Sequence, residues 1–428
     1  MADGKHVRKR HRKKHSHSLR YTLFVIALIA MGGLMWGAHI RSDLPQSAIP
    51  AVADSPNPTS TVPPSPTPEP TPIVETVHFS ASGDNLIHKP IYEQAKRRAE
   101  NEQSDAPYDF SYVYENLSDF FAQFDVNWIN QESLVNDTLP PSTYPAFSTP
   151  GECAKALYDI GFRVFALSNN HSYDKGANGI SATLQFWNSM PEDVITTGLW
   201  KNTENNDARI PVQEVNGIKI AYLAYTEHTN GISINPSKLE ANVIYTNETE
   251  AMQRQIEHAR SLADVVVVGV HWGIEYNHQA TESQKALAQQ FADWGADVII
   301  GTHPHVLQDA QWLTAADGRR AFVAYSLGNF ISTQDRMPRA VGGILTLDMV
   351  KTTDVDGSVS VCIQEPKIHP VITHYDAGRS NVRNYLYRDY TPELAAQHGM
   401  NAYDSSFSYD QLRKIAEDSV SSEFLTLD

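Results

Sequence analysis

The sequence predicts an α/β protein in which helices cover mainly parallel or mixed β-sheets. From about residue 74, short runs rich in β-forming residues alternate with helical runs. Apolar runs such as VVVVGV (265–270) lack polar alternation, which is typical of strands buried on both faces. Asn216-Gly217 and Asp356-Gly357 stand between strand-like runs and predict tight turns.

The predicted elements follow one another along residues 76–363. Helices are expected near residues 91–103, 110–123, 152–160, 178–190, 249–262 and 281–294. Strands are expected over residues 76–82, 125–130, 163–168, 193–198, 212–215, 218–225, 263–270, 296–301, 320–326, 344–350 and 358–363. The last fifty residues have a more helical pattern. We therefore expect a folded domain over 74–375 and a mostly helical C-terminal extension over 376–428, whose role the sequence leaves open.

The charge of the chain is divided unevenly. The 428 residues carry a formal net charge of −16, yet residues 1–20 hold eight Lys or Arg and one acidic residue, which is +7. The other 408 residues therefore carry −23, the difference between those two values. An acidic body argues against nucleic-acid binding, which needs clustered cationic side chains. Two cysteines, Cys153 and Cys362, exclude a disulfide-dense scaffold and a cysteine-rich zinc protein, and their redox state stays open.

The N-terminal residues predict a membrane anchor. Residues 21–40 contain no Asp, Glu, Lys or Arg, and twenty helical residues span about 30 Å, the thickness of a bilayer core. The basic head at 1–20 would stay in the cytoplasm, which places the rest outside the cell. Residues 41–73 read as an extended extracellular linker, because 44–72 include ten prolines. The alternative is a cleaved signal peptide, whose apolar segment is usually shorter.

Polar side chains follow five of the predicted strands. They are Asp84, Glu132, the run Asn169-Asn170-His171 with Asp174, His271 with Glu275, and the run Thr302-His303-Pro304-His305. Because the carboxyl ends of parallel strands meet at one crevice, these side chains are expected to converge. Carboxylate and imidazole ligands favour Zn²⁺, Mn²⁺ or Fe. Taken singly, each residue also has an ordinary structural reading, as a helix cap, a turn former or a solvated acid.

The His303-Pro304-His305 run is the most specific local indication of a metal-binding site. Proline favours an extended conformation in the residue before it, and in an extended chain residues i and i+2 point the same way. We therefore expect an extended segment that turns both imidazoles toward one site.

At these residues the sequence resembles the bacterial capsule-synthesis proteins of the CapA/PgsA type, whose ectodomain is similar to the calcineurin-like metallophosphoesterases. The resemblance covers about residues 76–364. It rests on GDNLIH (83–88), NQES (130–133), SNNHSYDKG (168–176), HWGIEY (271–276), GTHPHV (301–306) and YSLGNF (325–330). It implies two packed mixed β-sheets flanked by helices, and a role in the synthesis, attachment or export of a poly-γ-glutamate capsule.

The resemblance also implies roles for individual residues. One or two divalent metal ions (Mn, Zn or Fe) would be held by Asp84, Glu132, Asn170, His271, His303 and His305. His171 would act near the leaving group, with Asp174 orienting it. Two positions depart from the phosphoesterase pattern. Leu86 stands where those enzymes typically carry a histidine, and Asn130-Gln131-Glu132 replaces their second Gly-Asp.

Three functions stay open at this point. The first is a membrane-anchored protein of capsule or anionic wall-polymer biosynthesis or export, with a divalent-metal site. It would contact the polymer and membrane-bound ligase components, and no nucleic acid. The second is an extracytoplasmic metal-dependent phosphoesterase or other hydrolase. The third is a non-catalytic scaffold that binds polymer. A body of net charge −23 repels a polyanion, so contact needs bound divalent cations, which we prefer, or a local basic patch.

Overall fold

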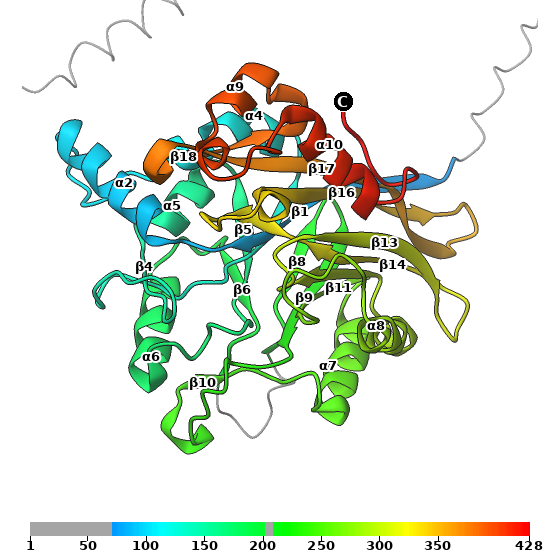
Figure 1. Cartoon of the computed structure of the whole chain (residues 1–428). Helices are drawn as coiled ribbons and strands as arrows, with labels where there is room; N and C mark the ends of the chain where they lie inside the picture. The colour runs from blue at the N-terminus through cyan, green and yellow to red at the C-terminus, as the bar shows by residue number, and fades with distance from the viewer. Residues whose placement is uncertain (1–70, 202–208) are drawn as a thin grey trace, which may run out of the picture. The chain divides into compact units, whose positions relative to one another are not determined.

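A computed structural model describes residues 71–201 and 209–428 (Figure 1). The predicted basic head and membrane span lie outside the described residues, as does nearly all of the predicted linker. Within the described ranges, no helix has both the length and the apolar character needed to cross a membrane. Residues from Glu69 to the C-terminus make up one compact unit, which includes both the predicted domain and its extension.

The main helices of this unit are short to medium in length. They are α2 (Lys89–Asn101), α3 (Ser111–Tyr114), α4 (Ser118–Phe121), α5 (Glu152–Asp159), α6 (Gly176–Trp187), α7 (Thr249–Leu262), α8 (Glu282–Trp294), α9 (Pro392–Gln397) and α10 (Tyr409–Ser419). Three of them, α8, α9 and α10, begin after a residue whose side chain accepts a backbone N–H of the first turn. In α8, Thr281 Oγ1 accepts a hydrogen bond from the Gln284 backbone N–H, and Gln284 Oε1 accepts one from the Thr281 backbone N–H.

The strands form two large mixed sheets. The first has the order β18-β17-β16-β1-β2-β5-β6, with β15 paired to β1. Its strands are β1 (Ile73–Asn85), β2 (Val126–Asn130), β5 (Phe162–Ala166), β6 (Ile195–Thr197), β15 (Asn329–Ile331), β16 (Val341–Thr353), β17 (Val359–Asp376) and β18 (Ser380–Leu386). The second has the order β13-β14-β12-β11-β9-β8. Its strands are β8 (Val212–Val215), β9 (Ile218–Thr226), β11 (Val265–His271), β12 (Val298–Thr302), β13 (Leu307–Thr314) and β14 (Arg320–Leu327).

Short pairs complete the described strands. β3 (Val135–Asn136) pairs in parallel with β4 (Thr149–Pro150), and β7 (Trp200–Lys201) pairs with β10 (Ala241–Asn242). In each large sheet four adjacent strands are parallel: β1, β2, β5 and β6 in the first, and β9, β11, β12 and β14 in the second. The carboxyl ends of five of these strands lead into the polar residues considered below.

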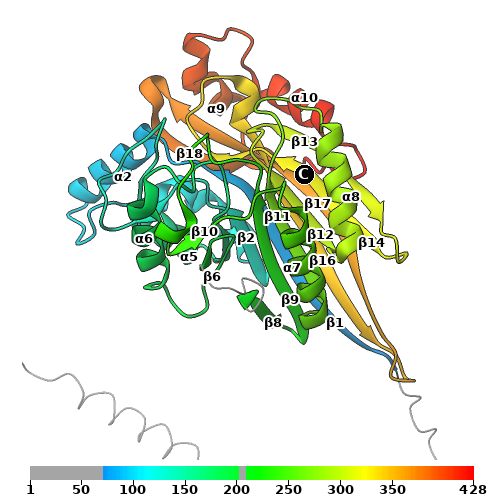
Figure 2. The same ribbon diagram turned by 90° about the horizontal axis from the view of Figure 1, so that it is seen from below.

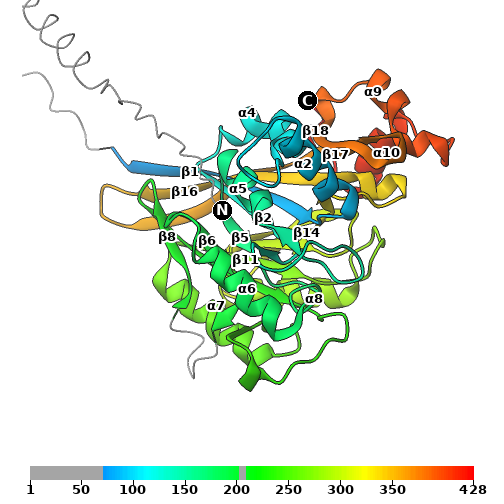
Figure 3. The same ribbon diagram turned by 90° about the vertical axis from the view of Figure 1, so that its left-hand side faces the viewer.

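The two sheets pack face to face. Trp128 of β2 lies against Gly269 of β11 so closely that a Cβ on the glycine would come within 2.6 Å of the indole. Apolar residues of both sheets share one buried cluster, while α7 and α8 cover the outer face of the second sheet (Figure 2). Helices α2 to α5 bury their apolar faces against the same cluster as the first sheet, and α6 lies beside β5 and β6 (Figure 3). The predicted α/β layering with mixed sheets and flanking helices is confirmed.

Most of the predicted elements are present. The helix expected at 249–262 is α7, and Asn216 and Gly217, at φ 47° and 79°, form the tight turn between β8 and β9. The single helix expected over 110–123 is wrong, because a 3₁₀ turn at Glu115–Leu117 separates α3 from α4. Strand β13 was missed. The stretch after residue 376 contains β18, which pairs with β17, as well as helices.

Candidate metal centre

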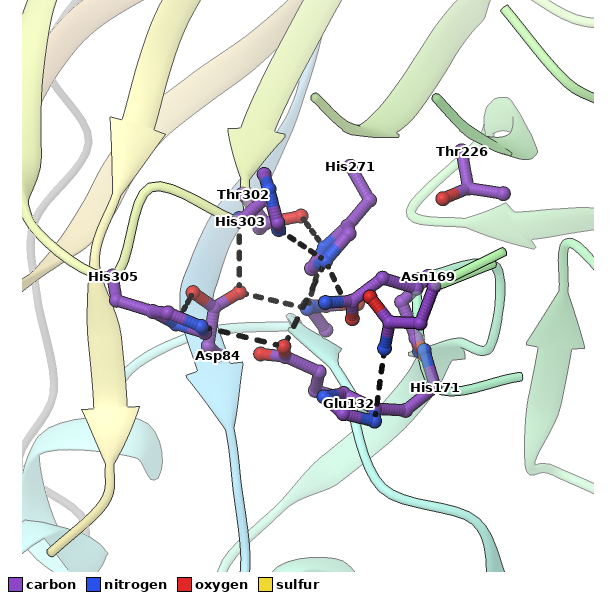
Figure 4. A network of polar contacts seen from close by, with 12 residues as sticks. Asp84, Glu132, Asn169, His171, Thr226, His271, Thr302, His303 and His305 are labelled. Atoms are coloured by element: carbon purple, nitrogen blue, oxygen red, sulfur yellow. Dashed lines mark hydrogen bonds and ion pairs between the residues drawn. The ribbon is translucent and has the colours of Figure 1, made fainter. Parts of the chain in front are cut away.

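Polar side chains from five strand ends meet in one buried place (Figure 4). Asp84 lies near the end of β1, Glu132 follows β2, Asn170 and His171 follow β5, His271 ends β11, and His303 and His305 follow β12. All of these residues are at most 5% exposed. The structure therefore brings together the six predicted ligands and the predicted proton donor, which come from both sheets.

Two carboxylates form the base of the site. One Asp84 oxygen accepts a hydrogen bond from Asn130 Nδ2 at 2.8 Å, and the other lies 3.0 Å from His305 Nδ1. Glu132 is fully buried, and neither of its oxygens has a hydrogen-bond partner. Burial first, and then the charge of Asp84, raise the pKa of Glu132 well above its usual range. A buried carboxylate without donors is costly, so this side chain favours a cation beside it.

The histidines surround these carboxylates. His271 Nε2 lies 3.1 Å from Asn170 Oδ1, 3.1 Å from His303 Nδ1 and 3.7 Å from Glu132 Oε1. His305 Nε2 is also 3.7 Å from Glu132 Oε1. Burial lowers the pKa of His271 well below its usual range and that of His303 to about 2. These two rings are therefore neutral at physiological pH, which is the form that binds metal ions.

The expectation of an extended His303-Pro304-His305 segment is wrong. His303 has φ 97° and His305 has φ 58°, both in the left-handed region that non-glycine residues rarely adopt. The segment is a sharp bend between β12 and β13, and the His303 backbone N–H points at Asp84 Oδ1, at 3.4 Å. Both rings still face the site, because the bend turns them there. Such backbone strain is typical of functional sites.

The His171–Asp174 pair lies at the edge of the site. Asp174 Oδ2 accepts a hydrogen bond from His171 Nδ1 at 2.8 Å and another from the Phe147 backbone N–H at 2.6 Å. The Phe147 ring packs edge-on against the His171 ring, with centroids 4.6 Å apart. These contacts fix the imidazole, so its Nε2 is the atom left to exchange a proton.

The residues present fit a divalent cation. Asp84, Glu132 and His305 offer three ligand atoms that all lie within 4.8 Å of one another. Around His271 Nε2, a carboxylate oxygen, an amide oxygen and an imidazole nitrogen converge. One N–H cannot donate to all three acceptors, whereas one cation can bind several such lone pairs. Nitrogen and oxygen ligands without thiolate suit Zn²⁺, Mn²⁺ or Fe, and nothing in the donor set selects among them.

Several residues that had no role assigned from the sequence support the site. Asn130 holds Asp84, and Thr302 Oγ1 lies 3.0 Å from His271 Nδ1. The ring of His228 packs edge-on against that of His303, with centroids 5.0 Å apart. His228 follows β9 by two residues, so the strand-end rule that found the other histidines could have found it. His88, the last residue of the GDNLIH run, also lies nearby, and burial followed by the charge of His305 lowers its pKa to about 3.

The chain matches the family described as bacterial capsule synthesis protein PGA_cap over residues 78–334, which is more than half of its length. It belongs to that family. The family member named capsule biosynthesis protein CapA, from Bacillus anthracis, is 30% identical over 261 residues, 58% of each chain. The PGA biosynthesis protein CapA of Bacillus subtilis (strain 168) is 34% identical over 186 residues, 44% of this chain and 47% of that protein.

The matches thus span about half the length of these curated relatives. They confirm the predicted resemblance to capsule-synthesis proteins of the CapA type. Among solved structures, the NAD nucleotidase NadN of Haemophilus influenzae is similar at 13% identity and a TM-score of 0.39, over 83% of this chain and 64% of that one. A likeness this weak says nothing about the chemistry of this family member's site.

Proposed function

We propose that this chain is a membrane-anchored, extracytoplasmic component of capsule biosynthesis or export, whose buried centre holds divalent metal and contacts an anionic polymer of the poly-γ-glutamate type. The family assignment supports the capsule role. One observation supports the metal centre: buried Glu132, with both oxygens unpartnered, lies against His271 and His305. Anchoring is supported by residues 21–40, which carry no Asp, Glu, Lys or Arg after a basic head.

Each residue of the site would have a role in binding the cation. Asp84, Glu132, His271, His303 and His305 would hold the cation, and Asn170 would add an amide oxygen. A bound divalent cation supplies positive charge to an anionic group and acidifies water. The cation would thus bring a carboxylate or phosphate chain to a body that otherwise carries −23 beyond its first 20 residues.

A second candidate function is hydrolysis of a phosphate or related ester. The observation that favours it is the His171–Asp174 pair, because a polymer-binding scaffold has no need of an oriented imidazole at the edge of its site. His171 holds a proton on Nδ1 against Asp174, so a second proton at Nε2 can pass to a leaving group. Asp174 keeps the ring in that orientation.

The test compares the full chain with Asp84→Ala and His303→Ala in cells that lack their own copy. Polymer on the cell surface is measured, and so is hydrolysis of a generic phosphoester by the purified full chain. We expect both substitutions to abolish surface polymer at unchanged protein level, whereas Glu282→Gln, on the exposed start of α8, leaves it intact. Normal polymer from both variants would refute a metal-dependent capsule role. Phosphoester hydrolysis lost in the same variants would favour the second candidate.

A further inference from the structure

The loop after β11 folds over the bend that carries His303 and His305. The Tyr276 backbone N–H donates to the Pro304 carbonyl at 2.7 Å, which ties the two segments together. The Gly273 backbone N–H donates to Glu227 Oε2 at 2.7 Å and holds the start of the loop. Gly273 and Tyr276 have φ 89° and 66°, so this loop, like the bend it touches, has left-handed backbone. The loop is therefore held in an uncommon conformation next to the site.

This conformation puts the Glu275 carboxylate at the open side of the site. Glu275, His303 and His305 offer ligand atoms that all lie within 4.8 Å of one another. His305 also belongs to the inner group with Asp84 and Glu132, so the two groups adjoin. The inner group is fully buried, whereas Glu275 is exposed. An ion in the outer group would face solvent, and hence a substrate.

A second observation points to a ligand here. The unpartnered, fully buried Glu132 oxygens belong to the inner group and lie next to the histidine that both groups share, because Glu132 Oε1 is 3.7 Å from His305 Nε2. Leu86, by contrast, is an apolar side chain that is 2% exposed and contributes no ligand from the end of β1. Compared with the metallophosphoesterase pattern, the site therefore lacks one metal ligand beside Asp84 and has one more potential ligand, Glu275, in the loop.

We propose that Glu275 is a metal ligand of this chain, which completes an outer cation position with His303 and His305 and so provides the donor that Leu86 does not. This inference rests on the proposed metal centre. Tyr276 acts as a positioning residue, because its backbone N–H ties the loop next to Glu275 to the Pro304 carbonyl. The Arg339 guanidinium lies over the Tyr276 ring, 3.4 Å from its centroid, and holds the ring in place.

The test uses the full chain, purified in detergent and stripped of metal, and titrates it with Mn²⁺. Binding is followed by calorimetry and by electron paramagnetic resonance, in which adjacent Mn²⁺ ions give a coupled signal and a single ion gives six lines. The variants are Glu275→Gln, which keeps the size of the side chain and removes the charge, and Glu275→Asp. Glu282→Gln is the matched control, because its side chain is 90% exposed and pairs only with Lys285 among the described ion pairs. Circular dichroism checks that each variant is folded.

We expect wild type and Glu282→Gln to give the coupled signal. Glu275→Gln should weaken the second binding event by at least about 10- to 100-fold, the effect of losing even an outer-shell partner, and leave the six-line signal. Glu275→Asp should restore part of the affinity. Identical titrations of wild type and Glu275→Gln would overturn the inference and leave the inner centre standing. Absence of Mn²⁺ binding in wild type would instead overturn the proposed metal centre, and this inference with it.

Discussion

Replacing Glu132 with glutamine is expected to change stability in opposite directions without and with a divalent cation. Without metal, the wild-type side chain is fully buried beside Asp84 and has no hydrogen-bond partner for either oxygen. A buried polar group left unsatisfied costs about 1–3 kcal/mol, and more when it is charged. Glutamine keeps the shape and, unlike Glu132 with its raised pKa, takes up no proton on folding, so we expect the metal-free variant to be more stable at neutral pH by about 1–3 kcal/mol.

With a divalent cation bound, wild type should be more stable to unfolding than Glu132→Gln. An ion that binds only the folded state at 100 times its Kd stabilises that state by about 2.7 kcal/mol. Wild type should gain this amount, and Glu132→Gln should gain little, because a neutral amide attracts a cation more weakly than a carboxylate does. The assay is urea unfolding of both proteins in EDTA and in excess Mn²⁺. Glu282→Gln serves as the surface control, for which we expect changes within about 0.5 kcal/mol. A variant that is destabilised in EDTA, or that gains as much from Mn²⁺ as wild type, would refute the reasoning.

Three further predictions concern the scaffold. Burial lowers the pKa of His398 to about 4, where Nδ1 accepts the Met400 N–H. In the unfolded chain this histidine takes up a proton near pH 6.5, whereas in the folded chain it does so only near pH 4. Folding stability should therefore fall by about 3 kcal/mol as the pH drops from about 6.5 to about 4. Urea unfolding measured across this pH range should show a weaker dependence of stability on pH in His398→Gln. Gly83→Ala would place a Cβ 2.0 Å from the Gly328 carbonyl oxygen, so the backbone beside Asp84 must move. We expect a loss of at least about 1–3 kcal/mol together with weaker Mn²⁺ binding, and unchanged binding would contradict this. Asp297→Ala removes the carboxylate that pairs with both Arg260, at 2.6 Å, and Arg319, at 3.1 Å. Both arginines are partly exposed, so thermal melts should show a loss of about 1–3 kcal/mol with Mn²⁺ affinity retained.

The convergence of the site residues could be predicted because it depends on topology. Each candidate follows an apolar run, and parallel strands deliver their carboxyl ends to one edge whatever the intervening helices do. Asp84 and His305 are 221 positions apart, yet their side chains lie 3.0 Å from each other. This prediction required only the recognition of buried parallel strands and of the residues that follow each of them, and both can be identified in the sequence.

The details that failed depend on tertiary contacts. The bend at His303 and His305 is stabilised by the Tyr276 N–H on the Pro304 carbonyl, which no local pattern reveals. Strand β13, with the sequence LQDAQWLT, mixes polar and apolar residues and is a strand because it pairs with β14. The sequence predicts that Glu275 approaches the site from the end of β11, but its place beside His303 and His305 depends on the fold of its loop over the bend, which no local pattern reveals.

Anomalous diffraction from crystals of the chain grown with Mn²⁺ tests the central claim most directly, since it reports the position of every bound ion. The account predicts a peak among Asp84, Glu132, His271, His303 and His305, with ligand distances of about 2.0–2.3 Å. A map without a peak among these side chains, at Mn²⁺ concentrations that load other manganese proteins, would contradict it.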